Sequence, residues 1–175
     1  MLKTALSALA ALGLAAGSAT AQDFSHQLQD GRTLTVMAET PCGAPRREDD
    51  ARMAFLVTFT CLDDVSGLAG EGFFAVGAQP GETTPREYLL AIAEEYWPER
   101  SAEAREAEIV PATATGMSGS LAVLCLLGAD AEQARGEATC VADHPRTQVI
   151  MQGRSSGAEA ALGVLTMFIS GVSVR

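Results

Sequence analysis

The sequence predicts an α+β fold, in which an antiparallel β-sheet is flanked by two main helices in an α/β/α sandwich and is stapled by disulfides. Three observations predict this fold class. Several stretches alternate apolar and polar residues with the period of strands. Two stretches of helical period begin with residues typical of helix N-termini. Four cysteines occupy positions that fit pairing within a sheet.

The first residues, MLKTALSALAALGLAAGSATAQ, have the order of a secretory signal peptide. Lys3 precedes an apolar run from Ala5 to Ala16, and small residues end at Ala21. The run is too short for a membrane span. We expect cleavage after Ala21, a single globular domain over 22–175, and a periplasmic or secreted protein that is not membrane-spanning.

The net charge of the chain limits the kinds of partner that it can bind. Acidic residues number 22 against 12 basic ones, for a net charge of −10, and loss of Lys3 with the leader makes the charge one unit more negative. A surface this acidic repels phosphate backbones and anionic lipids. We therefore expect no nucleic-acid partner.

The first half of the chain predicts four strands. Asp30-Gly31 separates two extended runs, 23–29 and 32–39, as in a hairpin. MAFLVTFTCL alternates so that one face, which includes Cys61, is apolar, and EGFFAVGA at 71–78 is its expected antiparallel neighbour. The charged segment TPCGAPRREDDAR, which joins the run 32–39 to MAFLVTFTCL, is expected to be a loop.

The segment 85–97 has the features of a helix. Thr84 and Glu87 fit a capping box, Pro85 suits the first helical position, and Pro98 ends the run. A buried stripe is expected at helical spacing, formed by Leu89, Ile92, Ala93 and Tyr96. The following polar ERSAEAREAE could extend helically, but it lacks an apolar stripe, so a solvated connection is expected instead.

The second half predicts strands and a terminal helix. EIVPATATG suggests an edge strand because it contains Pro111. SLAVLCLLGA, GEATCVAD and RTQVIMQGRSS follow as three strands. A second capping box, Ser156 with Glu159, is expected to open a helix that ends near Gly171 and is buried against the sheet.

Four cysteines in an exported domain point to disulfides. Pairing Cys125 with Cys140 centres a hairpin between Glu132 and Gln133, which is also the centre of the turn-like ADAEQARGE. Opposed residues without hydrogen bonds lie about 4.5 Å apart at Cα, which a disulfide accepts. Cys42 and Cys61 form the remaining pair, although four cysteines allow three connectivities. Without C-x-x-C, we expect no metal and no cofactor.

Other candidate chemistry is sparse. Asp63-Asp64, Asp143-His144 and Glu94-Glu95 are the clusters of acids and imidazole, and adjacent carboxylates point apart in strands and helices. GMSGS at 116–120 matches a nucleophile elbow only loosely, and His26 is expected on a strand surface. No catalytic residue is assigned.

Aromatic residues gather near the end of the first helix. Trp97 and Tyr96, with Arg86, are the candidate interface residues, because tryptophan, tyrosine and arginine are enriched at protein interfaces. The alternative is that the aromatic residues pack in the core and cover the end of the helix.

The order of elements in SLAVLCLLGADAEQARGEATCVADHPRTQVIMQGRSSGAEAALGVLTMFISGV resembles the Mog1/PsbP-like fold family. Two paired strands, one more strand and a terminal helix carry the resemblance, which covers about half of the mature chain. The resemblance implies a sheet with helices on both faces and a binding or accessory role in an exported bacterial protein.

Three functions follow as hypotheses. The first is a non-enzymatic accessory or binding protein that recognises another envelope or secreted protein. The second is a small hydrolase that uses His144 with Asp63 or Asp64. The third is an inhibitor or immunity-type protein whose acidic surface complements a basic target.

Overall fold

The fold is seen in a computed structural model, which describes residues 22–63, 68–78, 83–130, 135–142 and 149–175. The expected signal peptide lies outside these residues. The elements in chain order are β1 (Phe24–Gln27), β2 (Thr33–Val36), β3 (Arg46–Arg47), β4 (Met53–Asp63), β5 (Leu68–Gly77), α1 (Pro85–Tyr96), α2 (Ala102–Glu106), β6 (Ile109–Thr115), β7 (Ser120–Asp130), β8 (Arg135–Ala142), β9 (Val149–Ser155), α3 (Ala158–Ile169) and β10 (Val172–Val174).

Two antiparallel sheets organise these elements. The main sheet has seven strands in the order β3-β4-β5-β9-β8-β7-β6, and a small sheet has the order β1-β2-β10. The α+β class, the antiparallel pairing and the predicted hairpin at Asp30-Gly31 are confirmed. Gly31 has a φ of +88°, which a glycine adopts without strain.

The core lies mainly between the main sheet and α3. Phe55, Val57, Phe59 and Cys61 of β4 are buried on this side, as their alternation predicts. Phe59 stacks on Phe168 of α3, with 3.8 Å between ring centroids. The small sheet closes one end of the same core with Leu34, Val36 and Val172.

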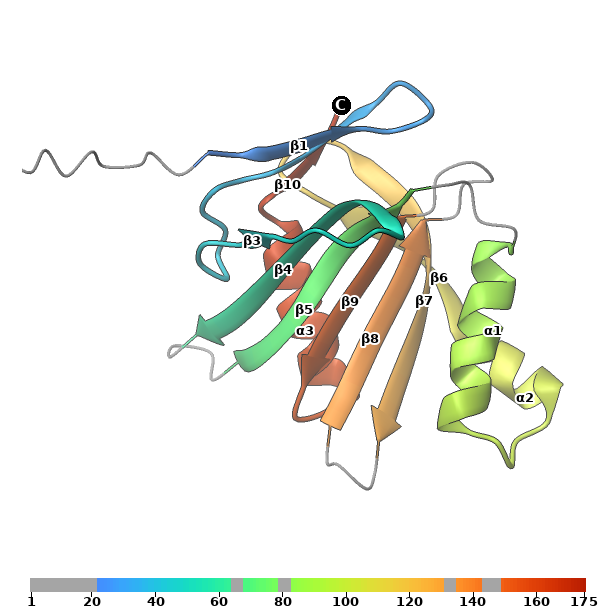
Figure 1. The fold of residues 1–175 in the computed structure, drawn as a ribbon. Coiled ribbons are helices and arrows are strands. Elements are labelled where there is room, and N and C mark those ends of the chain that lie inside the picture. Colours follow the sequence, from blue (N-terminus) through green and yellow to red (C-terminus); the bar gives the residue numbers. More distant parts are fainter. Residues whose placement is uncertain (1–21, 64–67, 79–82, 131–134, 143–148) are drawn as a thin grey trace, which may run out of the picture.

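The opposite face of the main sheet is covered only in part. α1 contacts β6, β7 and β8, and a second buried cluster forms there around Leu89, Ala93 and Leu126. Figure 1 shows α3 behind the sheet and α1 at one side of its front. The main sheet is therefore larger than the two predicted helices can cover, and the predicted α/β/α sandwich is not confirmed.

The α1 prediction is confirmed in detail. The helix begins at Pro85, and the Thr84 hydroxyl accepts from the Glu87 N–H while the Glu87 carboxylate accepts from the Thr84 N–H. The buried residues of the expected stripe are Leu89 and Ala93.

The segments beside the helices differ in part from the prediction. ERSAEAREAE is solvated as expected, since α2 has no buried residue, but part of it is helical: Ser101 caps α2, and Arg105 pairs with Glu94 of α1. α3 begins at Ala158 with Gly157 as its N-cap, so the expected capping box at Ser156 does not form. A Cβ on Gly136 of β8 would lie 1.8 Å from the Gly157 carbonyl carbon. The backbone at the N-cap of α3 therefore lies directly against β8.

Two strands were not expected. β3 forms within the predicted loop, where Arg46 pairs with Thr58 of β4. β10 follows α3 and pairs with β2, with Ser173 opposite Thr35. β10 depends on a partner distant in sequence, so local patterns do not indicate it, whereas β3 is only two residues long and both of its residues are exposed arginines, so it shows no alternation.

Candidate functional site

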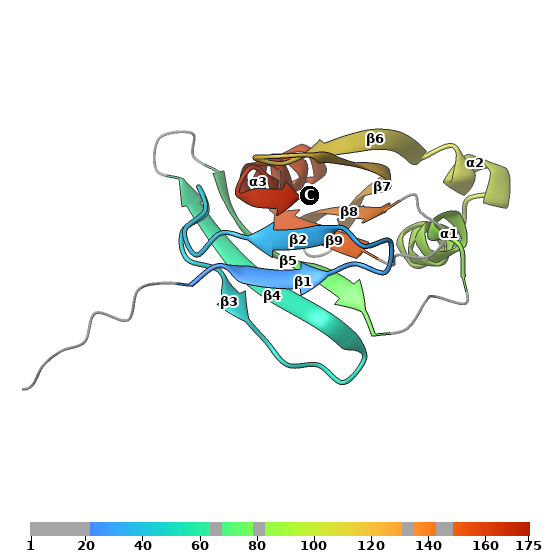
Figure 2. The same ribbon diagram turned by 90° about the horizontal axis from the view of Figure 1, so that it is seen from above.

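A polar face of the main sheet is left open over β4, β5 and β9. On this side, within the described part of the chain, α1 lies toward β6, β7 and β8, and β3 runs beside the outer edge of β4. Figure 2 shows α1 displaced to one end of the sheet. The side chains on this face, which we call the open face, are Thr58, Thr60, Glu71, Phe73, Gln152 and Arg154.

Two rows of directly opposed residues cross the open face and continue onto β8. The first row runs through Thr60, Glu71, Arg154 and Glu137. The second row runs through Thr58, Phe73, Gln152 and Thr139. Because opposed side chains lie about 4.5 to 5.5 Å apart at Cβ, each row offers several polar groups to one ligand.

Glu137 is the centre of a hydrogen-bond network at the side of the open face nearest α1. Its carboxylate accepts from the Thr139 hydroxyl at 3.2 Å, from the Gln152 amide and from Arg154 Nε at 2.9 Å. The Gln152 amide also donates to the Thr139 hydroxyl at 3.2 Å. Thr139 is 1 % exposed and Gln152 8 %. The network therefore fixes the side chains of Gln152 and Arg154 on the open face.

Tyr96 links α1 to this network. Burial raises the pKa of its phenol, and a hydrogen bond to the Glu137 carboxylate raises it further. The same ring packs on β7, where a Cβ on Gly128 would lie 2.5 Å from a ring carbon. Burial also raises the pKa of Tyr88, followed by the charges of Glu137 and Glu95. Both phenols are neutral donors at physiological pH.

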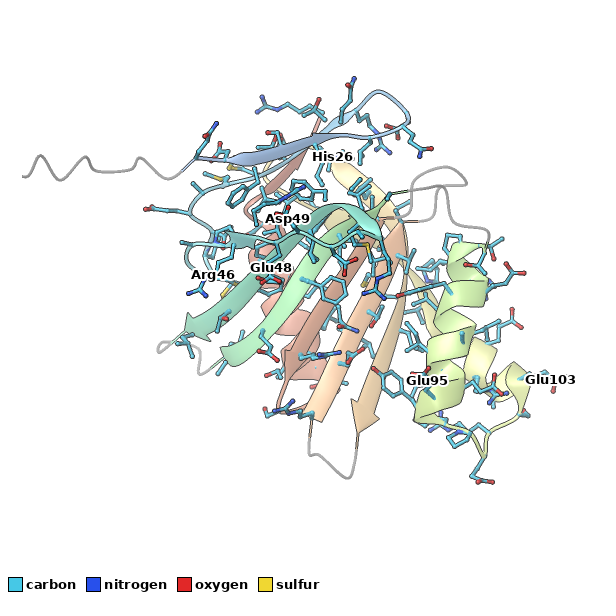
Figure 3. The ribbon with its side chains drawn as sticks, viewed as in Figure 1. His26, Arg46, Glu48, Asp49, Glu95 and Glu103 are labelled. Carbon is cyan, nitrogen blue, oxygen red and sulfur yellow. A yellow bond between two sulfur atoms is a disulfide. The ribbon has the colours of Figure 1, made fainter. Side chains whose placement is uncertain are left out.

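The open face is hollowed. A hollow of about 550 Å³ lies between the segment from Cys42 to Glu48 and the strands, and a second of about 440 Å³ continues along β4 and β9. Thr60, Glu71 and Arg154 line both hollows, which together form one trough. Figure 3 shows Glu48 and Arg46 in front of β4 and Glu95 on α1 across the face.

The trough carries unpaired charges of both signs. Glu71 and Arg46 line it, and the side chain of neither has a hydrogen bond or ion pair to another described residue. By contrast, Glu48 accepts from the Thr58 hydroxyl at 2.8 Å, and Arg154 is paired with Glu137. The carboxylate of Glu71 and the guanidinium groups of Arg46 and of Arg135, which lines the second hollow, thus remain available to a ligand.

The candidate interface residues at α1 all make contacts within the chain. Arg86 pairs with Glu106 of α2 at 3.1 Å. The Arg100 guanidinium lies 4.5 Å from the centroid of the Trp97 ring, and Tyr96 is held as described above. Trp97 and Tyr96 are partly buried against the α1 cluster. Their role in binding a partner stays a prediction.

The other sequence candidates fall into two groups. Asp64, Asp143 and His144 lie outside the described residues, so the hydrolase hypothesis is untested. Ser118 of GMSGS is bonded to the Ser173 hydroxyl at 2.5 Å and to Arg175 Nε at 3.0 Å. Ser118 therefore has a structural role in joining β10 to the turn before β7.

Within the described residues the one histidine is His26, which does not line the trough. His26 lies on β1 with its ring centroid 5.6 Å from that of Phe55, and Arg47 covers the same Phe55 ring at 4.3 Å. Burial lowers the pKa of His26, and the nearby Arg47 charge lowers it further. Among the described residues, no cluster of histidine, cysteine, aspartate or glutamate is arranged to hold a metal ion.

Both predicted disulfides are present. Cys125 lies opposite Cys140 in the β7–β8 ladder, with a Cα separation of 4.1 Å. Cys42 joins Cys61 and so fixes the segment before β3 against β4 at the wall of the trough. Two disulfides are compatible with an oxidising compartment. In the part of the chain described, no helix has the length and apolarity to cross a membrane.

Comparison with known proteins adds no family. No protein-family model matches the chain, and no curated protein matches it. The resemblance to the Mog1/PsbP-like fold family therefore stays a prediction.

The open face contains none of the catalytic motifs considered in the sequence, so the sequence analysis did not predict it. The available signal was the second face of each alternating strand, where Thr58 and Thr60 alternate with Val57 and Phe59. Gln152 and Arg154 of β9 alternate in the same way with buried neighbours. A polar second face indicates exposure to solvent in an antiparallel sheet.

Proposed function

We propose that this protein is an exported, non-enzymatic binding protein that recognises another protein of the bacterial envelope through the trough on its open face. The observation that carries the proposal is the pair of unpartnered opposite charges, Glu71 and Arg46, on two sides of one polar trough. The trough spans several strands, so it suits an extended polypeptide segment better than a small compact ligand.

The chemistry of the trough defines the kind of segment it accepts. Glu71 can pair with a basic side chain of the segment, and Arg46 can pair with a carboxylate. The half-buried Phe73 adds an apolar contact between its polar neighbours. The Glu137 network holds Arg154 and Gln152 in place before the partner arrives, which reduces the ordering cost of binding.

Two features support a binding role over catalysis. The carboxylate of Glu137 is engaged by donors within the chain. His26, the histidine within the described residues, lies on β1 and packs against Phe55 rather than beside the trough.

Photocross-linking in the producing cell tests the proposal. A photoreactive amino acid at Thr60 lies within the trough, and the same amino acid at Thr166 lies on the exposed side of α3 as a matched control. We expect a discrete cross-linked protein adduct from position 60, which the Glu71→Lys variant loses, and none from position 166. Equal adducts from both positions, or none from position 60, would contradict the proposal.

A further inference from the structure

The outer edge of β6 is an unusual feature of the main sheet. Its sequence, IVPATAT, has no charged residue, although the whole chain has a net charge of −10. Residues Val110 to Thr113 are consecutively exposed, so both faces of the strand meet solvent there. Natural edge strands are commonly protected by charges or proline, and here Pro111 is the only such residue.

The register shows which backbone groups of β6 point away from β7. The Gly116 N–H donates to the Gly119 carbonyl at 3.3 Å in the turn that joins the two strands. In an antiparallel ladder, every second residue directs its backbone N–H and C=O toward the partner strand. Like Gly116, the residues Val110, Ala112 and Ala114 therefore direct these groups toward β7. The Cα separation of 4.1 Å between Cys125 and Cys140 supports this register, because so short a distance marks an opposed pair without hydrogen bonds. The backbone groups of Cys125 therefore point away from β8 and toward Val110 of β6.

The outward groups therefore belong to Pro111, Thr113 and Thr115. The missing N–H of Pro111 faces outward, so it breaks no bond to β7. The backbone groups of Thr113 and Thr115 on this side have no hydrogen-bond partner in the described part of the chain. The open stretch ends there, because the Met117 N–H donates to the Val172 carbonyl at 2.8 Å.

We infer that this edge pairs with β6 of a second copy of the chain, antiparallel and centred on Thr113. In this register the two Thr113 residues exchange both of their backbone hydrogen bonds. Thr115 of each copy lies opposite Pro111 of the other and donates its N–H to the proline carbonyl. The edge is thus self-complementary despite its proline, as a two-fold interface requires.

Charge explains why a second copy fits this edge. Two chains of net charge −10 repel each other, and an uncharged strand is where they approach at least cost. The acids beside the strand are neutralised within the chain, since Glu108 pairs with Arg100 and Glu106 with Arg86. Figure 2 shows β6 at the outer limit of the main sheet, with the other six strands on one side of it.

Sedimentation equilibrium of the mature chain, from about 1 µM to about 1 mM, tests the inference, since a contact of this small size forms a weak dimer. Thr113→Pro removes an outward N–H and no hydrogen bond to β7, and Thr113→Val, the matched control, also loses the hydroxyl but keeps the N–H. We expect the wild type and Thr113→Val to dimerise alike and Thr113→Pro to raise the dissociation constant at least tenfold. A monomeric wild type, or a Thr113→Pro variant that dimerises like the wild type, would overturn the inference.

Amide hydrogen exchange of the wild type gives a second readout that does not depend on a variant folding. The N–H groups of Thr113 and Thr115 should exchange more slowly as the protein concentration rises, whereas those of Ala112 and Ala114 should be protected at every concentration. Exchange at Thr113 and Thr115 that is independent of concentration would exclude this pairing.

Discussion

Replacement of Glu137 by alanine should destabilise the fold substantially. The Glu137 side chain is 17 % exposed, and its carboxylate accepts hydrogen bonds from Thr139, Gln152 and Arg154, as well as from Tyr96. A hydrogen bond to a charged group contributes about 1.5 to 3 kcal/mol net. Thr139 and Gln152 still bond to each other in the variant. We therefore expect a loss of roughly 2 to 4 kcal/mol in the free energy of unfolding.

Arg154→Gln is the matched comparison. The Arg154 side chain is 48 % exposed, so its ion pair with Glu137 contributes at most about 1 kcal/mol. In urea unfolding at 25 °C, Glu137→Ala should lower the midpoint by roughly 1 to 2 M and Arg154→Gln by much less. Equal losses in the two variants, or a loss under about 1 kcal/mol for Glu137→Ala, would refute the assignment of Glu137 as the centre of the network.

Three further predictions concern other parts of the fold. Because burial lowers the pKa of His26 below its ordinary 6.5, stability present above pH 6.5 should fall as the pH drops toward the folded-state pKa, and His26→Gln should flatten that part of a stability-against-pH curve. Replacing Cys125 and Cys140 together by alanine opens a bridge between residues separated by 15 positions, which should cost about 3 kcal/mol by urea unfolding; an unchanged midpoint would contradict this. Gly128→Val places a side chain within the Tyr96 ring, so near-ultraviolet circular dichroism should change although the far-ultraviolet spectrum is kept, and two unchanged spectra would show that α1 does not pack there.

The sequence predicted most of the elements because their signals are local. The alternation in β4, the capping box at Thr84 and the turn at Asp30-Gly31 each act within a few residues. The pairing of Cys125 with Cys140 was also predictable, because a hairpin fixes its own register. The disulfide framework therefore followed from strand geometry together with the count of cysteines.

The remaining features depend on contacts that local patterns do not encode. β10 forms because Val172 and Val174 meet β2 at the far end of the chain. The N-cap of α3, Gly157, lies against Gly136 of β8, a contact between residues 21 positions apart. Which strands α1 leaves uncovered depends on the strand order, in which β9 lies between β5 and β8. Sequence motifs therefore did not indicate the open face, although all of its residues except Phe73 are polar positions within strands.

The central claim is that the trough binds a partner through Glu71 and Arg46, and titration calorimetry with the partner captured from position 60 tests it most directly. Glu71→Lys and Arg46→Glu should each weaken binding at least tenfold, about 1.4 kcal/mol, and the affinity of the wild type should fall as salt is added. Glu159→Lys, an equal change of charge on the exposed side of α3, should leave the affinity unchanged. Wild-type affinity in both trough variants, or an equal loss in the α3 control, would contradict the account.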